Sequence, residues 1–231
     1  GARASQTPLQ RQSAAQPDPD LRADGGVQPR RHIHRDVHGR AQLAHLVVAG
    51  LQSETRGLLL EILEQCPQVR TIVVSAGGGG LCSVTAVVTK AISPDVNVVA
   101  VQAAGAAAFP DSLDAGHPVA LDSMATIADG IAVGCPGALT FDLVRAYADR
   151  VVTVSEEALS RALLFCLERA KLVVEPAGAA GVAALMDDPS ALEPPVVVVL
   201  SGGNVDPVLL VRVLRHGLAA AGRYLSFHVR I

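Results

Sequence analysis

Apolar residues follow two alternating spacings along the chain from about Gly57 onward. Over 58–65, leucine and isoleucine recur at the interval of a helix, and a proline soon follows. The segments 71–75 and 96–101 are β-branched runs, which is the pattern of strands buried on both faces. Between them, 81–92 has the pattern of a helix. This order predicts a βαβ unit whose two strands are parallel.

The same alternation continues through the second half of the chain. We expect a strand at 150–154, a helix that begins after a Ser155 cap, a helix at 176–185, a strand at 196–200 and a helix at 207–220. Residues 224–231 alternate between apolar and polar, like a strand whose partners are missing. Together these patterns predict an α/β fold with a doubly wound, mostly parallel sheet over 57–223.

Residues 1–56 differ in composition from the rest of the chain. They contain no Phe, Tyr, Trp, Met, Cys or Lys, whereas Arg, Ala, Gln, His, Pro and Asp are frequent. Such a segment buries too little apolar surface to offset the entropy that ordering costs, so disorder is expected over at least 1–39. The more apolar stretch 42–50 is able to pack. We therefore expect a boundary near Gly57.

Composition and charge favour small molecules as the binding partners of this chain. Half of the residues are apolar and the formal net charge is −3, which gives no reason to expect nucleic acid or an anionic membrane as a partner. The four cysteines are free of Cys-x-x-Cys spacing, so neither a zinc site nor a disulfide framework is indicated, and reduced, mostly buried thiols are expected. With no apolar run of membrane-spanning length and no signal-peptide pattern, a cytoplasmic protein is expected.

Four consecutive glycines, Gly77 to Gly80, stand between a predicted strand and a predicted helix. Glycines in this place let backbone N–H groups converge on an anion at the positive end of the helix, so a phosphate site is predicted, with a flexible turn as the alternative. The dinucleotide fingerprint fails, because Cys82 or Ser83 occupies its third glycine position and the next strand ends at Gln102. The sequence also does not match the phosphate-binding loop of mononucleotide-binding proteins, since no lysine follows the glycines.

Four short motifs carry a more specific resemblance: 74–81 (VSAGGGGL), 126–130 (TIADG), 175–179 (EPAGA) and 200–204 (LSGGN). In this order the chain resembles the threonine/serine ammonia-lyase and serine racemase family of fold-type II pyridoxal-phosphate enzymes, whose fold is like that of the tryptophan synthase β chain. Taken singly, each motif is equally well explained as a turn or a helix start. Their ordered occurrence favours the family.

The resemblance implies pyridoxal 5'-phosphate as cofactor and an amino acid as substrate, with threonine preferred and serine racemase or serine dehydratase as the alternative. It implies a homo-oligomer for the intact enzyme. Ser201 matches the residue that hydrogen-bonds the pyridine nitrogen, and a neutral hydroxyl there weakens the cofactor as an electron sink, which favours elimination over transamination. The residues implied to bind the cofactor are Gly77, Gly78, Gly79, Gly80, Leu81, Gly130, Glu175, Ser201 and Gly202.

No metal site is expected. The carboxylates that some relatives use to bind a divalent cation are replaced here by Gln102 and Ala108, neither of which offers a charged oxygen ligand. Histidines cluster in the Arg-rich first part of the chain, where solvated side chains are expected instead of a metal site: His32, His34, His38 and His45.

The lysine that forms a Schiff base with the cofactor in this family precedes the glycine loop, whereas the only lysines here are Lys90 and Lys171. No catalytic residue is therefore assigned, and the chain is expected to be inactive or feeble. We expect the fold to be incomplete at its N-terminal side, 1–56 to be out of frame or unrelated to the family, and 224–231 to begin a regulatory (ACT-like) domain. A non-catalytic binding or assembly module, or a gene relic, stays open.

Overall fold

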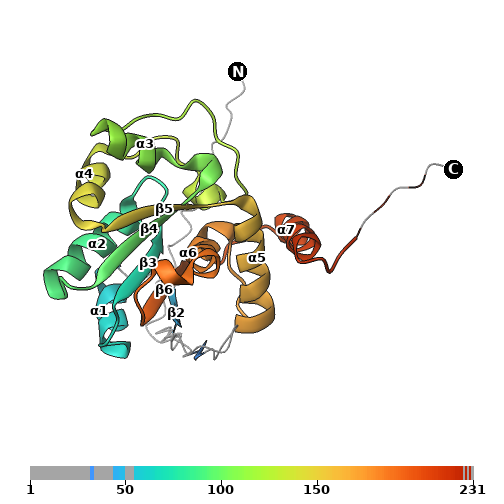
Figure 1. The fold of residues 1–231 in the computed structure, drawn as a ribbon, viewed down its shortest axis with the longest axis horizontal. Coiled ribbons are helices and arrows are strands. Elements are labelled where there is room, and N and C mark those ends of the chain that lie inside the picture. The colour runs from blue at the N-terminus through green and yellow to red at the C-terminus, as the bar shows by residue number, and fades with distance from the viewer. Residues whose placement is uncertain (1–31, 34–43, 50–54, 226, 228, 230–231) are drawn as a thin grey trace, which may run out of the picture.

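The computed structural model describes residues 32–33, 44–49, 55–225, 227 and 229, and a parallel sheet lies at its centre (Figure 1). The sheet has six strands in the order β1-β2-β6-β3-β4-β5. All neighbours are parallel except β1 and β2, which are antiparallel. The strands are β1 (His32–Ile33), β2 (Ala44–Ala49), β3 (Thr71–Ser75), β4 (Asn97–Ala103), β5 (Arg150–Val154) and β6 (Val196–Ser201).

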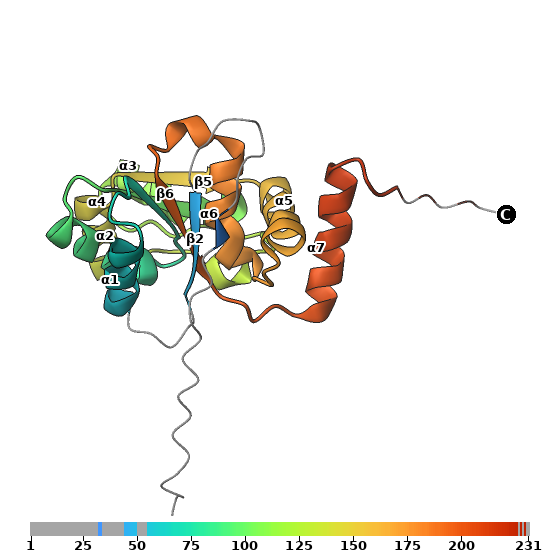
Figure 2. The same ribbon diagram turned by 90° about the horizontal axis from the view of Figure 1, so that it is seen from below.

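Helices cover both faces of the sheet (Figure 1). On one face lie α1 and α2, with α4 beside α2, and on the other lie α5 and α6, with α7 outside α5 (Figure 2). The helices are α1 (Thr55–Gln65), α2 (Gly80–Ile92), α3 (Ala108–Ala115), α4 (Ala138–Tyr147), α5 (Glu156–Phe165), α6 (Pro176–Asp187) and α7 (Pro207–Ala220). Shorter turns are η1 (Ala104–Ala106), η2 (Asp129–Ile131), the π-helical η3 (Cys166–Ala170) and η4 (Pro189–Ala191). The predicted doubly wound α/β sheet is confirmed.

The two faces of the central strands pack into separate cores. Along β3, Ile72 and Val74 face the core beneath α1, α2 and α4, while Val73 faces the core beneath α5 and α6. All three side chains are fully buried. Because successive strand residues point to opposite faces, burial on both sides explains why the strands are continuous β-branched runs.

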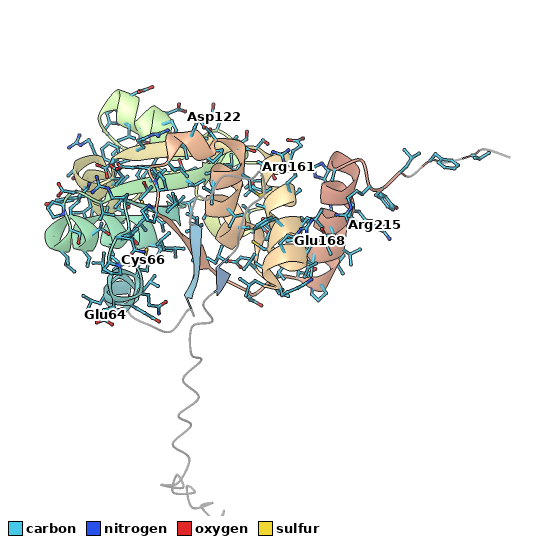
Figure 3. All side chains as sticks on the ribbon, turned by 60° about the horizontal axis from the view of Figure 1, so that its bottom comes forward. Glu64, Cys66, Asp122, Arg161, Glu168 and Arg215 are labelled. Carbon is cyan, nitrogen blue, oxygen red and sulfur yellow. The ribbon has the colours of Figure 1, made fainter. Side chains whose placement is uncertain are left out.

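Helix α7 lies to the side of the sheet and packs mainly against α5 (Figure 2). The hydroxyl of Ser160 lies 2.9 Å from Nδ1 of His216, and Arg223 forms an ion pair of 2.8 Å with Glu168. Figure 3 labels Glu168 beside α7, and Arg215 on the exposed outer side of that helix. Gly217 allows the close approach, since a Cβ there would lie 2.8 Å from the backbone oxygen of Ser160.

Most predicted segments match the structure closely. The strands at 71–75 and 150–154 and the helix at 207–220 have the predicted bounds. Ser155 caps α5 as predicted, since its hydroxyl accepts a hydrogen bond of 3.1 Å from the N–H of Ala158. The prediction of a strand at 224–231 is wrong for the described residues 224, 225, 227 and 229, which belong to no strand and are exposed.

The part of the chain before Gly57 contributes to the sheet. Strand β2, in the stretch expected to be able to pack, pairs with β6 from Ala44 opposite Val196 to Ala49 opposite Ser201. Strand β1 falls within 1–39, so the expectation of disorder is wrong at these two residues, and the rest of that range lies outside the described residues. Within the described part of the chain, no helix is both long and apolar enough to cross a bilayer.

Candidate functional site

A cavity of about 180 Å³ lies at the carboxyl ends of β3 and β6, beside the N-terminal end of α2. Ligands of open parallel sheets bind at this edge, because loops and helix N-termini converge there. The lining residues are Ser75, Gly77, Gly78, Gly79, Gly80, Leu81, Gly130, Ile131, Glu175, Ala177 and Ser201. Eight of the nine residues predicted to bind the cofactor thus line one cavity, and Gly202 directly follows Ser201.

The glycine loop joins β3 to α2 and leaves the first N–H groups of the helix free to bind a ligand. Gly79 is the N-cap, with φ of 95°, and no side chain caps this end of α2. The N–H groups of a helix's first turn have no partner within the helix, and they lie at the positive end of its dipole. The loop is therefore suited to hold an anionic group through backbone donors.

The carbonyl groups of the loop are anchored on the side opposite to the donors. Gly77 O accepts a hydrogen bond of 3.5 Å from the amide of Gln102, which is fully buried. Gly78 O accepts one from the N–H of Gly137, at 3.3 Å, and one from the hydroxyl of Thr140. In a planar trans peptide the N–H points opposite to the C=O, so the N–H groups of Gly78 and Gly79 point away from these anchors.

Close packing explains why glycine is required in the cavity wall. A Cβ at Gly79 would lie 2.8 Å from Cζ of Phe109, and a Cβ at Gly130 would lie 2.9 Å from Cβ of Ala177. At Gly80, by contrast, a Cβ would meet no atom within 4 Å. Glycine is therefore required at positions 79 and 130 by packing, and the four loop glycines bring no side chain into the cavity, so this wall fits a flat ring with a phosphate.

The remaining wall of the cavity carries its polar side chains, from Ser75, Ser201 and Glu175. The hydroxyls of Ser75 and Ser201, at the ends of β3 and β6, lie 3.1 Å apart. Glu175 precedes α6, is partly buried, and is joined to the next loop by its N–H, which donates to Gly202 O at 3.1 Å. Burial raises the pKa of the Glu175 carboxyl above its ordinary value. This wall therefore offers two hydroxyls and a carboxyl group that gains protons readily.

Three lining residues were not predicted from the sequence: Ser75, Ile131 and Ala177. Ser75 directly precedes the Ala76-Gly77 step and closes a β-branched run, as Ser201 closes another. Two serines at the ends of Val-rich strands are the signal that could have identified the pair. The prediction needed the additional knowledge that β3 and β6 are neighbours.

Gln102 and Ala108 are the residues that we expected in place of metal-binding carboxylates. Gln102 is buried against the loop, with Oε1 accepting the N–H of Phe109 at 2.9 Å, and Ala108 starts α3. Among the described residues, no three His, Cys, Asp or Glu side chains are grouped so that they could hold a metal ion.

Cys66, Cys82 and Cys166 are buried free thiols, as predicted, whereas Cys135 is exposed. Burial raises the pKa of Cys82 to about 12, so this residue of the first turn of α2 stays a thiol.

Both lysines lie outside the cavity lining. Lys90 is in the last turn of α2, ten residues beyond Gly80, or about 15 Å along the helix axis. Its ammonium group donates to Asp149 at 2.9 Å and to Val96 O at 2.9 Å. Lys171 follows η3 with φ of 58° and is exposed.

Comparisons with known proteins agree on one family. A family model described as "Pyridoxal-phosphate dependent enzyme" matches residues 44–202. The L-threonine ammonia-lyase of Thermotoga maritima is 44% identical over 164 residues, which are 71% of this chain and 41% of that protein. A serine racemase of Oryza sativa subsp. indica is 39% identical over 153 residues, 64% of this chain and 45% of that protein. The solved structure of processed threonine deaminase isoform 2 from Solanum lycopersicum matches with a TM-score of 0.66 and 29% identity, over 70% of this chain and 48% of that one. The chain therefore spans less than half the length of these relatives.

Proposed function

The chain belongs to the family of pyridoxal-phosphate dependent enzymes, and on that basis we propose that its cavity holds pyridoxal 5'-phosphate as part of an L-threonine ammonia-lyase. The reaction would convert L-threonine to 2-oxobutanoate and ammonia. One observation carries the proposal: the uncapped glycine loop at the start of α2 and the strand-end hydroxyl of Ser201 line the same cavity. The loop suits a phosphate and the hydroxyl suits a ring heteroatom.

Each wall of the cavity has a role in this proposal. The N–H groups of the loop from Gly77 to Leu81 would bind the phosphate, because they need no side chain and face an otherwise uncapped helix end. Gly130 and Ala177 would leave room for the ring, since both keep bulk out of the wall. When bound, the cofactor supplies an electron sink for bonds at the α-carbon of an amino acid.

Ser201 would determine which reaction the sink supports. A neutral hydroxyl can donate a hydrogen bond to the ring nitrogen without protonating it, which keeps the sink weak. A weak sink favours prompt loss of a β-hydroxyl over transamination. The carboxyl of Glu175 would add a group able to hold a proton at the same wall, since burial raises its pKa.

Threonine is proposed over serine because the Thermotoga maritima relative is more similar than the rice serine racemase, at 44% against 39% identity. Residues 221–224 also resemble the entry into the regulatory domain of threonine ammonia-lyases, and we propose that 224–231 begin such a domain. The expected boundary near Gly57 moves to about residue 44 in this proposal, because β2 and the family match both begin there.

Without a lysine in the cavity lining, the chain by itself is proposed to bind the cofactor non-covalently and to show little or no turnover. The first test titrates pyridoxal phosphate into the full chain and follows cofactor absorbance, with a Gly79→Val variant as the control for the loop. Saturable binding that the variant lacks is expected, and equal binding by both would contradict the proposal.

The second test addresses the substrate. Residues 44–223 are joined to the complementary N-terminal part of the Thermotoga maritima relative, and the product is assayed with threonine and with serine. Formation of 2-oxobutanoate in excess of pyruvate and D-serine is expected. Racemisation that exceeds oxoacid formation would favour the serine racemase alternative, and cofactor binding without any turnover would favour a non-catalytic module.

A further inference from the structure

Two serine hydroxyls meet in the wall of the cavity, although their residues are far apart in sequence. Ser75 ends β3 and Ser201 ends β6, and these strands are parallel neighbours in the sheet. Their oxygen atoms lie 3.1 Å apart, so one hydroxyl donates a hydrogen bond to the other. The two environments differ, because Ser75 is only 4% exposed whereas Ser201 is partly open to the cavity.

This difference in burial favours one direction for the hydrogen bond, in which Ser75 donates and Ser201 accepts. Within the described part of the chain, Ser201 is the only hydrogen-bond partner of the Ser75 hydroxyl. If Ser201 donated, the proton of Ser75, a residue only 4% exposed, would have no acceptor among the described residues, and leaving such a group unsatisfied costs free energy. If Ser75 donates, both protons are satisfied, since that of Ser201 can turn into the cavity toward water or a ligand.

We infer that Ser75 is a positioning residue of this site: its hydroxyl donates to Ser201 and thereby directs the Ser201 O–H into the cavity, toward a ring nitrogen that carries no proton. The inference rests on the proposed cofactor. It adds a residue to the site, and it makes the Ser201 hydroxyl a hydrogen-bond donor toward the cavity. A hydroxyl that already accepts a hydrogen bond from Ser75 is a better donor, because linked hydrogen bonds polarise one another.

The reverse arrangement would suit different chemistry. With Ser201 donating to Ser75, lone pairs would face the cavity and would favour a protonated, cationic nitrogen. Removing the Ser75 hydroxyl frees Ser201 to adopt either arrangement. Ser75 is therefore expected to control the protonation state that the cavity accepts, in addition to the affinity.

Binding by the full chain tests this directly. Pyridoxal phosphate and its analogue with C–H in place of the ring nitrogen are titrated into the parent chain, Ser75→Ala, Ser75→Thr, Ser201→Ala and the double alanine variant. Ser75→Ala should weaken binding of pyridoxal phosphate roughly two- to tenfold, the scale of one hydrogen bond. It should leave binding of the analogue unchanged, have no further effect in the Ser201→Ala background, and be rescued by Ser75→Thr.

A second readout follows the ring nitrogen itself. The absorbance of the bound cofactor should be nearly constant from about pH 5 to pH 9 in the parent chain. In Ser75→Ala it should shift as the pH falls, because a reoriented Ser201 tolerates the protonated nitrogen. Equal losses for both cofactors, or a pH profile unchanged by Ser75→Ala, would overturn the role of Ser75 while leaving cofactor binding intact. A parent chain that binds neither compound would instead overturn the proposed function.

A third readout needs no cofactor. Ser201→Ala removes the acceptor of a buried proton, whereas Ser75→Ala leaves Ser201 able to reach the cavity. Ser201→Ala should therefore lower the melting temperature by more than Ser75→Ala does. The opposite order would overturn the inferred direction of the hydrogen bond whatever the binding results.

Discussion

The backbone of Gly202 lies directly against the carboxylate of Glu175, so that a Cβ added to Gly202 would lie 2.2 Å from Oε1. Gly202 has φ of 129°, a conformation that other residues rarely adopt, and its carbonyl accepts the N–H of Glu175. This contact joins the end of β6 to the start of α6. It also holds in place Glu175, whose carboxyl group lines the cavity.

We expect Gly202→Ala to displace Glu175 and to disturb both walls of the cavity. The added methyl group combines backbone strain with a contact that the neighbour must relieve, and together these should cost about 2 kcal/mol of stability. Binding of pyridoxal phosphate should weaken in parallel. Chemical unfolding and cofactor titration measure the two effects.

Gly222→Ala is the matched control, because Gly222 also has a positive φ, of 67°, but a Cβ there would meet no atom within 4 Å. It should show the cost of strain alone, about 1 kcal/mol, and normal cofactor binding. If both variants lost the same stability and bound the cofactor equally, the contact between Gly202 and Glu175 would have no role in shaping the site.

The glycine loop offers a second pair of matched variants. Gly79→Ala places a methyl group 2.8 Å from Phe109 at φ of 95°, so it should destabilise the fold by about 2 kcal/mol and abolish phosphate-dependent binding. Gly80→Ala introduces a methyl group into open space at the first position of α2, where alanine favours the helix by up to about 1 kcal/mol. Thermal unfolding of both variants should therefore show shifts of opposite sign, and a loss of stability in Gly80→Ala would contradict the geometry of the loop.

The elements that could be predicted from the sequence are those marked by nearby glycine or proline residues and by a regular apolar pattern. Strand β3 is soon followed by the glycine loop, helix α7 begins at Pro207, and both have an unbroken pattern, so their limits were predicted correctly. Helix α3 was missed because it contains a proline within its first turn and has few large apolar residues. Helix α4 was missed because Leu139, an apolar residue in its first turn, is 72% exposed and blurs the amphipathic pattern.

The residues of the candidate site differ in the same way: those with a local signal were predicted, and those that depend on distant partners were not. The glycine loop was predicted because its signal is contiguous. Ser75 was missed because its role depends on a partner 126 residues away and on the order of strands in the sheet. The sheet order also explains why β2 was not assigned, since a strand that pairs with β6 carries no local sign of that partner.

Gln102 provides a test of how the loop is held in place. Gln102→Leu removes both the donor to Gly77 O and the acceptor of the Phe109 N–H, and leaves these buried groups without their partner. We expect a loss of about 1–3 kcal/mol in stability and weaker cofactor binding. Gln102→Glu is the matched variant.

The glutamate variant keeps an acceptor for Phe109 but places a negative charge beside the loop that would bind a phosphate. It should bind pyridoxal phosphate more weakly at pH 8 than at pH 5, because protonation of the new carboxyl removes the repulsion. Titrations at the two pH values measure this. Unchanged affinity in both Gln102 variants would show that the amide does not orient the loop.

Glu175 should make stability depend on pH in a defined direction. Burial raises the pKa of its carboxyl, so the folded state disfavours the carboxylate. Below the ordinary pKa of glutamate, roughly pH 4, the group is protonated in both states and Glu175→Gln should match the parent chain. As the pH rises through the folded pKa the parent loses stability, so Glu175→Gln should become the more stable protein.

Asp188 is the control, because its effect on stability changes with pH in the opposite direction. Its carboxylate accepts a hydrogen bond of 2.6 Å from Ser190, which is the main cause of its lowered pKa. That contribution to stability is present above the ordinary pKa and is lost as the pH falls through the folded one, so Asp188→Asn should be less stable than the parent at neutral pH. Urea unfolding of the three proteins at pH 4 and pH 8 compares them. A neutral-pH stability of Glu175→Gln below that of the parent would refute the burial effect.

Lys90 is predicted to be structural. Its ammonium group ties the end of α2 to Asp149 and to two backbone carbonyls, and Asp149 in turn accepts the N–H of Val98 at 2.7 Å. Lys90→Met should therefore lower stability by about 1 kcal/mol, given the partial exposure of the pair. Binding of pyridoxal phosphate and its absorbance spectrum should not change. Borohydride reduction of the cofactor complex, followed by peptide mass mapping, is the decisive measurement, and no label at Lys90 is expected. Label at Lys90 that is lost in Lys90→Met, but kept in a Lys171→Met control, would contradict a purely structural role. It would show that Lys90 reaches the cavity.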